Sequence, residues 1–387
     1  MSLFGHWMPE EENIAEELLP DLQLAFPEIE KFDLAALVHR PGIKYIGSNA
    51  TVISAYEPRR ERNVVLKSFL NESREDLGEF ALHDFFNEVT VLTALGSASA
   101  KSSTETSAFP VVHIYGYGVF ARKLTLVMEP LIGSMRDLLD LISDTRRTGQ
   151  ISSFKPTEKL YYWILWGEQM AKSLYFIHSH GIVHRDIKPE HFMFRGFNRL
   201  NTLILINFTS SRIFSDEFDL KKSSRFISSY EEHESNSNYS VVGTHPYVAP
   251  ETFGNQSITE KADIWALGFI LLELFGGYEA ISTYTSSRQG SIVQWCRDRQ
   301  APTVPSSLCD EILDEMKRWM DCKVWSHTLN SQCLQKWSTL QISIKRRIFT
   351  LVNECLSIDP ASRPSAKMIV ECFSNLLEEV SLFTAEC

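Results

Sequence analysis

The hydrophobic pattern of this 387-residue chain changes near residue 133, and this change strongly constrains its fold. Before it, from about residue 41, the pattern predicts strands at KYIGSNATVISAYE, RNVVLKSFL, VVHIYGYGVFA and KLTLVMEPL. One helix interrupts them, at LGEFALHDFFNEVTVLTAL. After it, helices dominate, and short strands are expected only at HFMF and LILINF. A small β-rich part followed by a larger helical part predicts an α+β fold with two lobes.

The composition excludes several classes of protein. The length and the 44% hydrophobic residues allow one large two-lobed domain or two domains, each with its own core. A net charge of -11 without a long basic run argues against nucleic-acid binding. No apolar stretch is long enough to span a bilayer, and MSLFGHWMPEEE lacks the features of a signal peptide.

All seven cysteines fall in the C-terminal third of the chain, without CxxC spacing. We expect reduced thiols in a cytoplasmic or nuclear protein, the alternative being a set of disulfides.

The N-terminal residues 9–33 hold nine acidic residues and one basic residue. Within them, Ile14, Leu18, Leu19 and Leu22 have helical spacing. One interpretation is a solvated amphipathic helix that packs on the domain. The alternative is a docking or autoinhibitory segment.

Several short motifs follow one another along the chain. VVLK ends at Lys67, and NEVTVL places Glu88 in the next helix. HRDIKPEH (184–191) is expected to form a rigid, irregular loop, because Pro189 fixes its own φ and restricts its neighbour. GTHPYVAPE (243–251), DIWALG (263–268) and DPASRPS (359–365) complete the series. In this order, the motifs resemble those of the eukaryotic protein kinase family, over about residues 40–380.

The resemblance implies a domain organisation. The kinase-like domain would span residues 37–380, with an N-lobe at 37–128, a hinge at 129–132 and a C-lobe at 133–380. An acidic extension (1–36) and a short tail (381–387) would flank it. The ligand is expected in the cleft between the lobes.

The same resemblance assigns roles to single residues. Asp186 would orient or deprotonate the attacking hydroxyl, and Lys188 would offset charge on the transferred phosphoryl group. Lys188 and Thr244 together are typical of the serine/threonine type. Lys67 would contact the phosphates of ATP, held by Glu88. The other implied ATP-binding residues are Gly47, Val52, Val65, Glu129, Leu131 and Met193.

Further matches predict architecture. The resemblance implies that Glu251 and Arg363 form a buried ion pair, and that Asp263 accepts hydrogen bonds from the backbone of the 184–186 loop. It also implies an apolar column of Leu92, His184 and Phe208.

Both metal-ligand positions of the family are changed. His191 stands where the family has Asn, and Asn207, Phe208 and Thr209 replace its Asp-Phe-Gly. Magnesium prefers oxygen ligands, especially carboxylates, whereas imidazole suits zinc, copper or iron. Asn207 keeps an oxygen but lacks the negative charge. The two changes together argue against bound Mg²⁺ or Mn²⁺ and against efficient turnover.

The phosphate loop is changed as well. YIGSNATV keeps only Gly47 and Val52 of the GxGxxGxV pattern, with Tyr45 and Ala50 at the outer glycine positions. Side chains there hinder close approach of the backbone to phosphates. Val65 replaces the small Ala that usually lies under adenine, which narrows the pocket.

Two long intervals separate the motifs of the C-lobe. The Ser-rich stretch KKSSRFISSYEEHESNSNYS, between Asn207 and Glu251, is either a disordered surface loop or a phosphorylatable segment read by Arg185. The interval between Asp263 and Arg363 contains SIVQWCRDRQ and CDEILDEMKRWMDCKVW. These two stretches predict extra helices that either pad the core or present a surface to a partner.

Three interpretations of the function stay open. The first is a catalytically impaired, pseudokinase-like regulatory or binding module with a protein partner, still able to bind ATP. The second is an active serine/threonine kinase with atypical metal use and a protein substrate. The third is a nucleotide-free scaffold.

Overall fold

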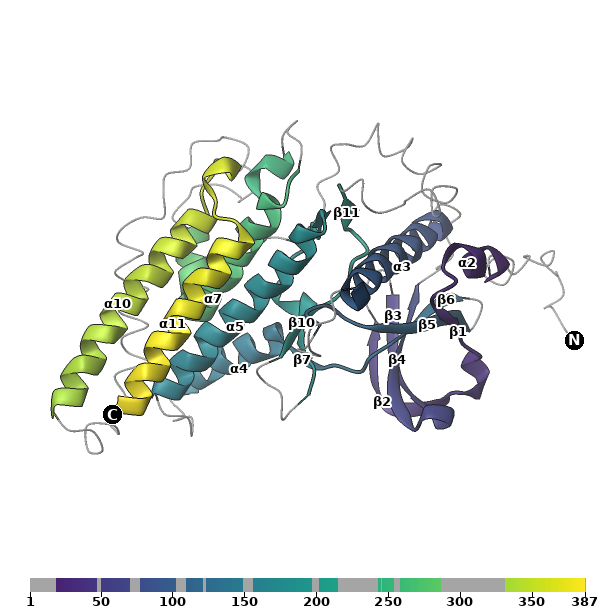
Figure 1. The fold of residues 1–387 in the computed structure, drawn as a ribbon, viewed down its shortest axis with the longest axis horizontal. Helices are drawn as coiled ribbons and strands as arrows, with labels where there is room; N and C mark the ends of the chain where they lie inside the picture. Colours follow the sequence, from purple (N-terminus) through teal and green to yellow (C-terminus); the bar gives the residue numbers. More distant parts are fainter. Residues whose placement is uncertain are drawn as a thin grey trace, which may run out of the picture. The chain divides into compact units, whose positions relative to one another are not determined.

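The structure is a computed structural model, drawn in Figure 1. It describes residues 19–46, 50–69, 77–101, 109–120, 123–148, 156–196, 202–214, 243–244, 246–253, 258–286 and 331–386. These residues divide between two compact units. With the gaps just given, the first unit holds residues 19–101 and 112–130, and the second holds 109–111, 131–214 and 243–386.

The first unit is built on a six-stranded sheet with the order β1-β5-β6-β4-β3-β2. Its strands are β1 (Glu30–Lys31), β2 (Val38–Ile46), β3 (Ala50–Glu57), β4 (Arg62–Phe69), β5 (Ile114–Phe120) and β6 (Lys123–Met128). All neighbouring strands are antiparallel except β1 and β5, which are parallel.

Alternate residues of β4 serve the two faces of this sheet. Val64 and Leu66 are fully buried on one face, in a cluster with Phe32, Leu34, Leu37, Ala55 and Val127. Lys67 points to the other face, where it meets Glu88 of α3 (Leu77–Lys101). Because successive side chains of a strand point to opposite faces, α3 and the residues around Phe32 cover opposite sides of the sheet.

Residues 30–37, which we call the cover segment, bind the outer side of β5. The Phe32 amide donates to the carbonyl oxygen of Tyr117 at 2.8 Å. Gly116 permits this approach, because a Cβ there would lie 2.2 Å from the carbonyl oxygen of Glu30. The cover segment ends in the 3-10 helix η1 (Leu34–Ala36), which Asp33 caps through the Ala35 amide at 3.2 Å.

The helix α2 (Leu19–Ala25) precedes the cover segment. Its Leu22 is fully buried, whereas Leu24 is 80% exposed. In the described part of the acidic region, one buried and one exposed leucine fit a helix with one side packed on the domain. Ile14 and Leu18, which belong to the same predicted pattern, lie outside the described residues.

The second unit is mainly helical. Its long helices are α4 (Met135–Thr148), α5 (Pro156–Ser179), α7 (Lys261–Ser286), α10 (Ser331–Cys355) and α11 (Ala366–Glu386) (Figure 1). Glycines let these helices pack closely. A Cβ on Gly167 of α5 would lie 2.7 Å from the ring of Phe373, and one on Gly268 of α7 would lie 2.8 Å from Cβ of Cys355.

Short strands and turns of the second unit lie beside these helices. β9 (Phe192–Phe194) lies between β7 (Ile132–Ser134) and β10 (Leu203–Leu205) in a three-stranded sheet. β8 (Ile182–Val183) pairs with β11 (Arg212–Ile213). The described 3-10 helices of this unit are η3 (Pro189–His191), η6 (Pro250–Phe253) and η8 (Pro360–Ser362).

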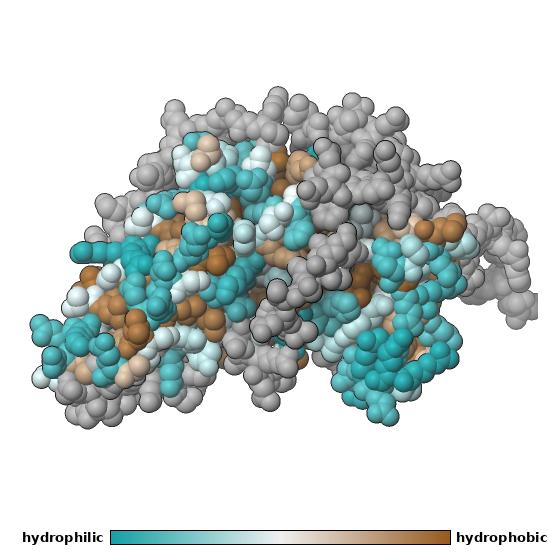
Figure 2. All heavy atoms as spheres, viewed as in Figure 1, coloured by the Kyte–Doolittle hydropathy of each residue, from teal (hydrophilic) through white to brown (hydrophobic). Residues whose placement is uncertain are grey.

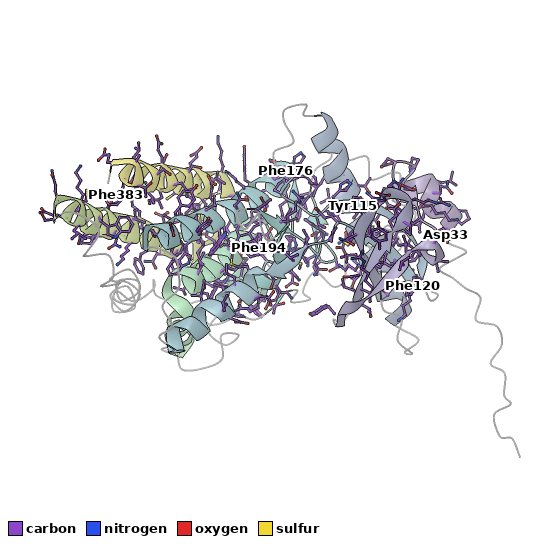
Figure 3. The ribbon with its side chains drawn as sticks, turned by 90° about the horizontal axis from the view of Figure 1, so that it is seen from below. Asp33, Tyr115, Phe120, Phe176, Phe194 and Phe383 are labelled. Atoms are coloured by element: carbon purple, nitrogen blue, oxygen red, sulfur yellow. The ribbon has the colours of Figure 1, made fainter. Side chains whose placement is uncertain are left out.

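Aromatic pairs join the outer helices of the second unit. The ring of Trp337 in α10 lies 4.9 Å, between centroids, from the ring of Phe383 in α11, and Phe383 is labelled in Figure 3. Figure 2 shows hydrophobic residues among the polar surface over these helices. Their large exposed hydrophobic residues are Ile342, Met368 and Leu382.

The α+β prediction is confirmed, with a sheet-rich first unit and a helical second unit.

The expectation of reduced cysteines is wrong for Cys333, which is disulfide-bonded, whereas Cys355 and Cys372 have free thiols. The stretches SIVQWCRDRQ and CDEILDEMKRWMDCKVW lie outside the described residues, as does the whole Ser-rich stretch KKSSRFISSYEEHESNSNYS. Among the helices in the described ranges, none combines the length and the apolar character needed to cross a membrane.

Candidate functional site

The backbone of the loop that follows β8, which begins at His184, is hydrogen-bonded to α7. Asp263, in the first turn of α7, accepts hydrogen bonds from the amides of His184 and Arg185, both at 2.9 Å. His178 lies 2.9 Å from the same carboxylate. Arg185 adopts a φ of 68°, in the left-handed region that non-glycine residues rarely occupy. The predicted contact of Asp263 with this loop is confirmed, and it fixes the direction of the residues that follow.

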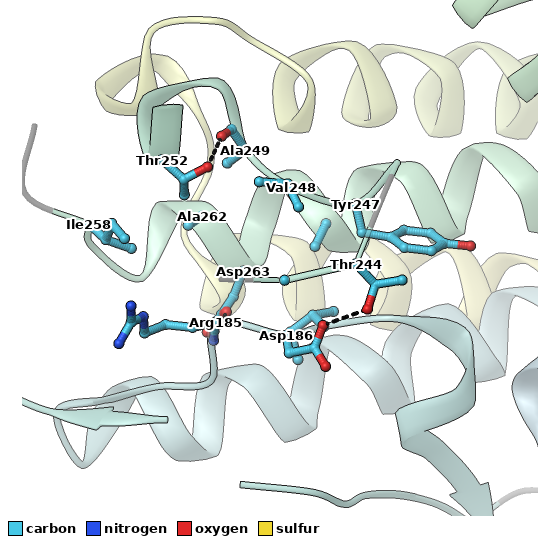
Figure 4. Close-up of a pocket in the computed structure, with 13 residues that line it drawn as sticks. Arg185, Asp186, Thr244, Tyr247, Val248, Ala249, Thr252, Ile258, Ala262 and Asp263 are labelled. Atoms are coloured by element: carbon cyan, nitrogen blue, oxygen red, sulfur yellow. Dashed lines mark hydrogen bonds between the residues drawn. The ribbon is translucent and has the colours of Figure 1, made fainter. Parts of the chain in front are cut away.

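Asp186, Lys188 and Thr244 form a closed triangle of polar side chains. The Thr244 hydroxyl donates to Asp186 Oδ1 at 2.9 Å (Figure 4). Lys188 Nζ lies 2.8 Å from Thr244 Oγ1 and 3.2 Å from Asp186 Oδ2. Burial opposes ionisation of Asp186, but the positive charge of Lys188 and the hydrogen bond from Thr244 outweigh it and lower the pKa of this carboxyl. The group is therefore a carboxylate at neutral pH.

His191 and Asn207, the two predicted metal positions, bind each other. His191 Nδ1 donates to the backbone carbonyl oxygen of Asp186 at 2.7 Å. Its other ring nitrogen, Nε2, lies 3.0 Å from Asn207 Nδ2. Burial lowers the pKa of His191 to about 3, although the nearby Asp186 carboxylate acts in the opposite sense. The imidazole is therefore neutral at physiological pH.

Residues around this pair are packed tightly. The rings of His184 and Phe208, both fully buried, lie 5.0 Å apart between centroids. His184 Nε2 lies 3.0 Å from the carbonyl oxygen of Ile206. Leu92, the third residue of the predicted column, is buried in α3 of the first unit.

The predicted Glu251–Arg363 ion pair is confirmed. Arg363 donates through both terminal nitrogens to Glu251, at 2.7 and 2.8 Å. The Arg363 side chain is 0% exposed and the Glu251 side chain is 3% exposed. This pair ties η6, just after the Thr244 loop, to the turn before α11.

In the first unit, Lys67 and Glu88 form the expected ion pair. Lys67 Nζ lies 2.5 Å from Glu88 Oε2, and their side chains are 11% and 0% exposed. Val52 is the register partner of Lys67 on β3, so both point to the same face of the sheet. Val65, two residues before Lys67, points to that face as well.

The remaining predicted nucleotide contacts are divided between the units. Glu129, in the first unit, accepts from the His113 amide at 2.9 Å through its side chain. Leu131 and Met193 are half-buried residues of the second unit. Gly47 lies outside the described residues. The structure therefore brings the predicted residues together as two groups, one within each unit.

The sequence motifs did not predict a polar network that lies beside the 184–191 loop. Arg136 of α4 donates to Glu273 of α7 at 2.5 and 3.0 Å, and to the Tyr247 hydroxyl at 2.6 Å. It also lies 3.3 Å from Glu190, the neighbour of His191. Burial opposes the charge on Arg136, but the Glu273 carboxylate outweighs it and raises the pKa of the guanidinium. Only the folded chain brings these residues together, because 137 positions separate Arg136 from Glu273.

The two predicted metal positions hold an imidazole and a neutral amide, which bind each other. Nε2 of His191 is the ring's only free lone pair, and an N–H of Asn207 already faces it. Asn207 offers a neutral amide in place of a carboxylate. Across the described part of the chain, no three His, Cys, Asp or Glu side chains are grouped to hold a metal ion.

Comparison with known proteins agrees with the motifs. A family model described as "Protein kinase domain" matches residues 46–372. Serine/threonine-protein kinase PKH2 of Saccharomyces cerevisiae is 29% identical over 156 residues, which cover 38% of this chain and 13% of that protein. Serine/threonine-protein kinase PDK1 of Cryptococcus neoformans is 29% identical over 182 residues, covering 47% and 13%.

A plant relative matches more of its own length. Mitogen-activated protein kinase kinase 7 of Arabidopsis thaliana is 25% identical over 224 residues, which cover 55% of this chain and 61% of that protein. The chain therefore spans less than two thirds of each of these three relatives.

Proposed function

Because this chain belongs to the protein kinase family, we propose that it is a catalytically impaired member that acts as a regulatory or binding module for another protein. The observation that carries this proposal is the hydrogen bond between His191 and Asn207 at 3.0 Å. In an active kinase, these two positions hold Mg²⁺, which neutralises charge on the transferred phosphoryl group. Here they bind each other, and neither supplies a carboxylate.

The intact part of the machinery gives this module a second property, the ability to bind ATP. Lys67 is held by Glu88 at 2.5 Å, as phosphate binding requires. The triangle of Asp186, Lys188 and Thr244 keeps the loop in one conformation. A fold with this much of the family's binding apparatus supports a nucleotide-binding role better than an empty scaffold.

A second candidate function is an active serine/threonine kinase with atypical metal use. It is favoured by the same triangle, because Asp186 is a carboxylate and Lys188 lies beside it. Its acceptor would be a protein hydroxyl. This candidate requires transfer of the γ-phosphoryl group without the two usual metal ligands.

Transfer of labelled phosphate from ATP distinguishes these functions. The full chain would be assayed with generic protein acceptors and for autophosphorylation, in Mg²⁺ and in Mn²⁺, beside an Asp186→Asn variant. We expect no difference between wild type and Asp186→Asn, since the wild type lacks the metal ligands. Transfer at ordinary kinase rates, about 1–100 per second, that depends on Asp186 would refute the proposal.

A further inference from the structure

We infer that the His191–Asn207 pair replaces the metal structurally, so that this chain binds ATP without a divalent cation. The inference rests on the proposed function, since it concerns the nucleotide site of an impaired kinase. It goes further in naming the ligand as metal-free ATP, and in treating the two substitutions as one unit.

The hydrogen bonds around His191 define which ring nitrogen carries the proton. A carbonyl oxygen can only accept, so Nδ1, at 2.7 Å from the Asp186 carbonyl oxygen, carries a hydrogen. Nε2 faces Asn207 Nδ2 at 3.0 Å. An amide nitrogen can only donate, so Nε2 is the acceptor and the ring carries its hydrogen on Nδ1 alone.

This orientation of the Asn207 amide is supported from its other end. Its Oδ1 lies 3.4 Å from the Thr209 hydroxyl. An amide oxygen can only accept, so the hydroxyl is the donor in this contact. Asn207 has a φ of 66°, a left-handed conformation that asparagine tolerates better than most residues. A chain of hydrogen bonds therefore runs from the Asp186 carbonyl through His191 and Asn207 to Thr209.

The chain of bonds links two segments that a metal would otherwise join. His191 ends η3, directly after the Asp186 loop, and Asn207 follows β10. His191 is 7% exposed, so its ring is buried where it bridges the two segments. The His191 amide nitrogen and carbonyl oxygen add bonds to Lys188 at 3.0 Å and to Ile206 at 2.9 Å.

Charge explains why the nucleotide needs no cation. A carboxylate at position 207 would repel the phosphates of ATP unless a cation lay between them. The Asn207 amide and the neutral His191 ring add no negative charge. Asp186, the remaining carboxylate, is already paired with Lys188 at 3.2 Å. ATP can therefore approach through its phosphates without Mg²⁺.

The pair also predicts that changing only one of the two residues to the family's usual ligand would break the hydrogen bond between them. Asn207→Asp would place a carboxylate against the lone pair of Nε2, where an N–H is needed. His191→Asn would remove the ring that bridges the two segments. Only the double change restores both oxygen ligands that Mg²⁺ requires.

Thermal unfolding of the full chain tests the inference. ATP should raise the midpoint by about 2–4 °C or more, equally in EDTA and in Mg²⁺, because it binds the native state without the ion. A shift seen only with Mg²⁺ would overturn the inference, and so would the absence of any shift in both buffers. Neither result bears on phosphate transfer, which tests the proposed function separately.

Three variants and one control variant sharpen the test. His191→Asn and Asn207→Asp should each lower the midpoint without ligand, and the double variant should gain an ATP shift that depends on Mg²⁺. Asn63→Asp, the same chemical change at an exposed position of β4, should change neither property. A Mg²⁺-dependent ATP shift already present in wild type or in Asn63→Asp would contradict the inference that Mg²⁺ dependence requires both changes at positions 191 and 207.

Nitrogen-15 NMR of the histidine side chains keeps the inference testable if the variants fail to fold. In wild type, the Nδ1 signal of His191 should be that of a protonated nitrogen, and the Nε2 signal that of a hydrogen-bonded acceptor. A protonated Nε2 would exclude the donor–acceptor arrangement with Asn207.

Discussion

Glu57, at the end of β3, shows how single charged residues stabilise the first unit. Its carboxylate accepts from Arg60 at 2.5 Å and from Arg62 at 2.6 Å, and the residue is 4% exposed. Arg60 also reaches Glu30 of the cover segment at 2.7 Å, and Arg62 stacks 3.6 Å over the ring of Tyr115. One buried carboxylate therefore orients two arginines that contact separate parts of the sheet.

We predict that Glu57 contributes a pH-dependent share of the stability. Burial opposes its charge, but the hydrogen bonds from Arg62 and Arg60 lower its pKa below the ordinary value of 4.5. A carboxyl with a lowered folded-state pKa stabilises above the unfolded-state value, and this contribution is lost as pH falls through the folded-state pKa. Glu57→Gln should therefore cost about 1–2 kcal/mol at pH 7 and progressively less below pH ~4.5.

Thermal unfolding at several pH values measures this difference. Glu61→Gln is the matched control, because Glu61 is an exposed neighbour in the same turn. An equal loss for Glu57→Gln at low and neutral pH would show that the carboxylate charge is not the cause.

Motifs and geometry contribute differently at this scale. The Lys67–Glu88 and Glu251–Arg363 pairs follow from motif positions, because the resemblance assigns both partners. The bond between His191 and Asn207 does not. Sixteen positions separate them, and it depends on a tautomer and an amide orientation that only the folded structure defines.

At the scale of elements, the cover segment and β5 depend on each other. A Cβ on Gly116 would lie 2.4 Å from the ring of Phe32, and one on Gly118 would lie 2.8 Å from its carbonyl oxygen. These two glycines therefore allow close packing of the cover segment on β5, because neither has the positive φ that would require glycine. Their lack of side chains allows Phe32 and Leu34 to reach the buried cluster.

We predict that Gly116→Ala loosens the cover segment. The added methyl group meets backbone and ring atoms, so the variant should be destabilised by about 1–3 kcal/mol. Hydrogen exchange followed by mass spectrometry should show faster exchange in residues 30–37. Gly96→Ala in α3 is the control: nothing lies within 4 Å of its new Cβ, and alanine should stabilise the helix by about 0.5–1 kcal/mol. Similar effects of the two variants would argue against the packing explanation.

The elements themselves were predictable where their periodicity is strong. β3 and β4 lie within the runs expected from the pattern, and α3 begins where its run begins but extends six residues beyond it, to Lys101. β1 has only two residues, too few for any alternation, and its pairing with β5 is defined by contacts far along the chain. In α10, the buried polar residues Gln341 and Lys345 interrupt the apolar stripe, so hydrophobic spacing alone does not mark this helix.

At the scale of the whole molecule, long-range polar contacts complete the second unit. Arg363 and Glu251 lie 112 positions apart. Arg363 also donates to the carbonyl oxygens of Ser357 and Lys261, both at 2.8 Å, and its guanidinium lies 4.9 Å from the Trp265 ring. Its charge is thus satisfied inside the protein by groups from several segments.

We predict that Glu251→Gln destabilises the second unit by about 3–5 kcal/mol, because it leaves a buried guanidinium without its counter-charge. Tryptophan fluorescence during denaturant unfolding reports on this unit, since the described tryptophans all belong to it: Trp163, Trp166, Trp265 and Trp337. Lys336→Ala, which removes an exposed ion pair with Glu386, should change the stability by less than about 1 kcal/mol. Equal losses in both variants would contradict a special role for burial.

The strand order of the first unit has a consequence for association between molecules. An open sheet has two edges, and unpaired backbone groups at an edge can recruit further chains into aggregates. Here one edge is the two-residue, charged strand β1, and the other is β2, which contains Pro41 and a register shift between His39 and Lys44. Proline cannot donate to a neighbouring strand, and a very short strand offers little to pair with. Both edges thus carry features that resist fibril-like growth.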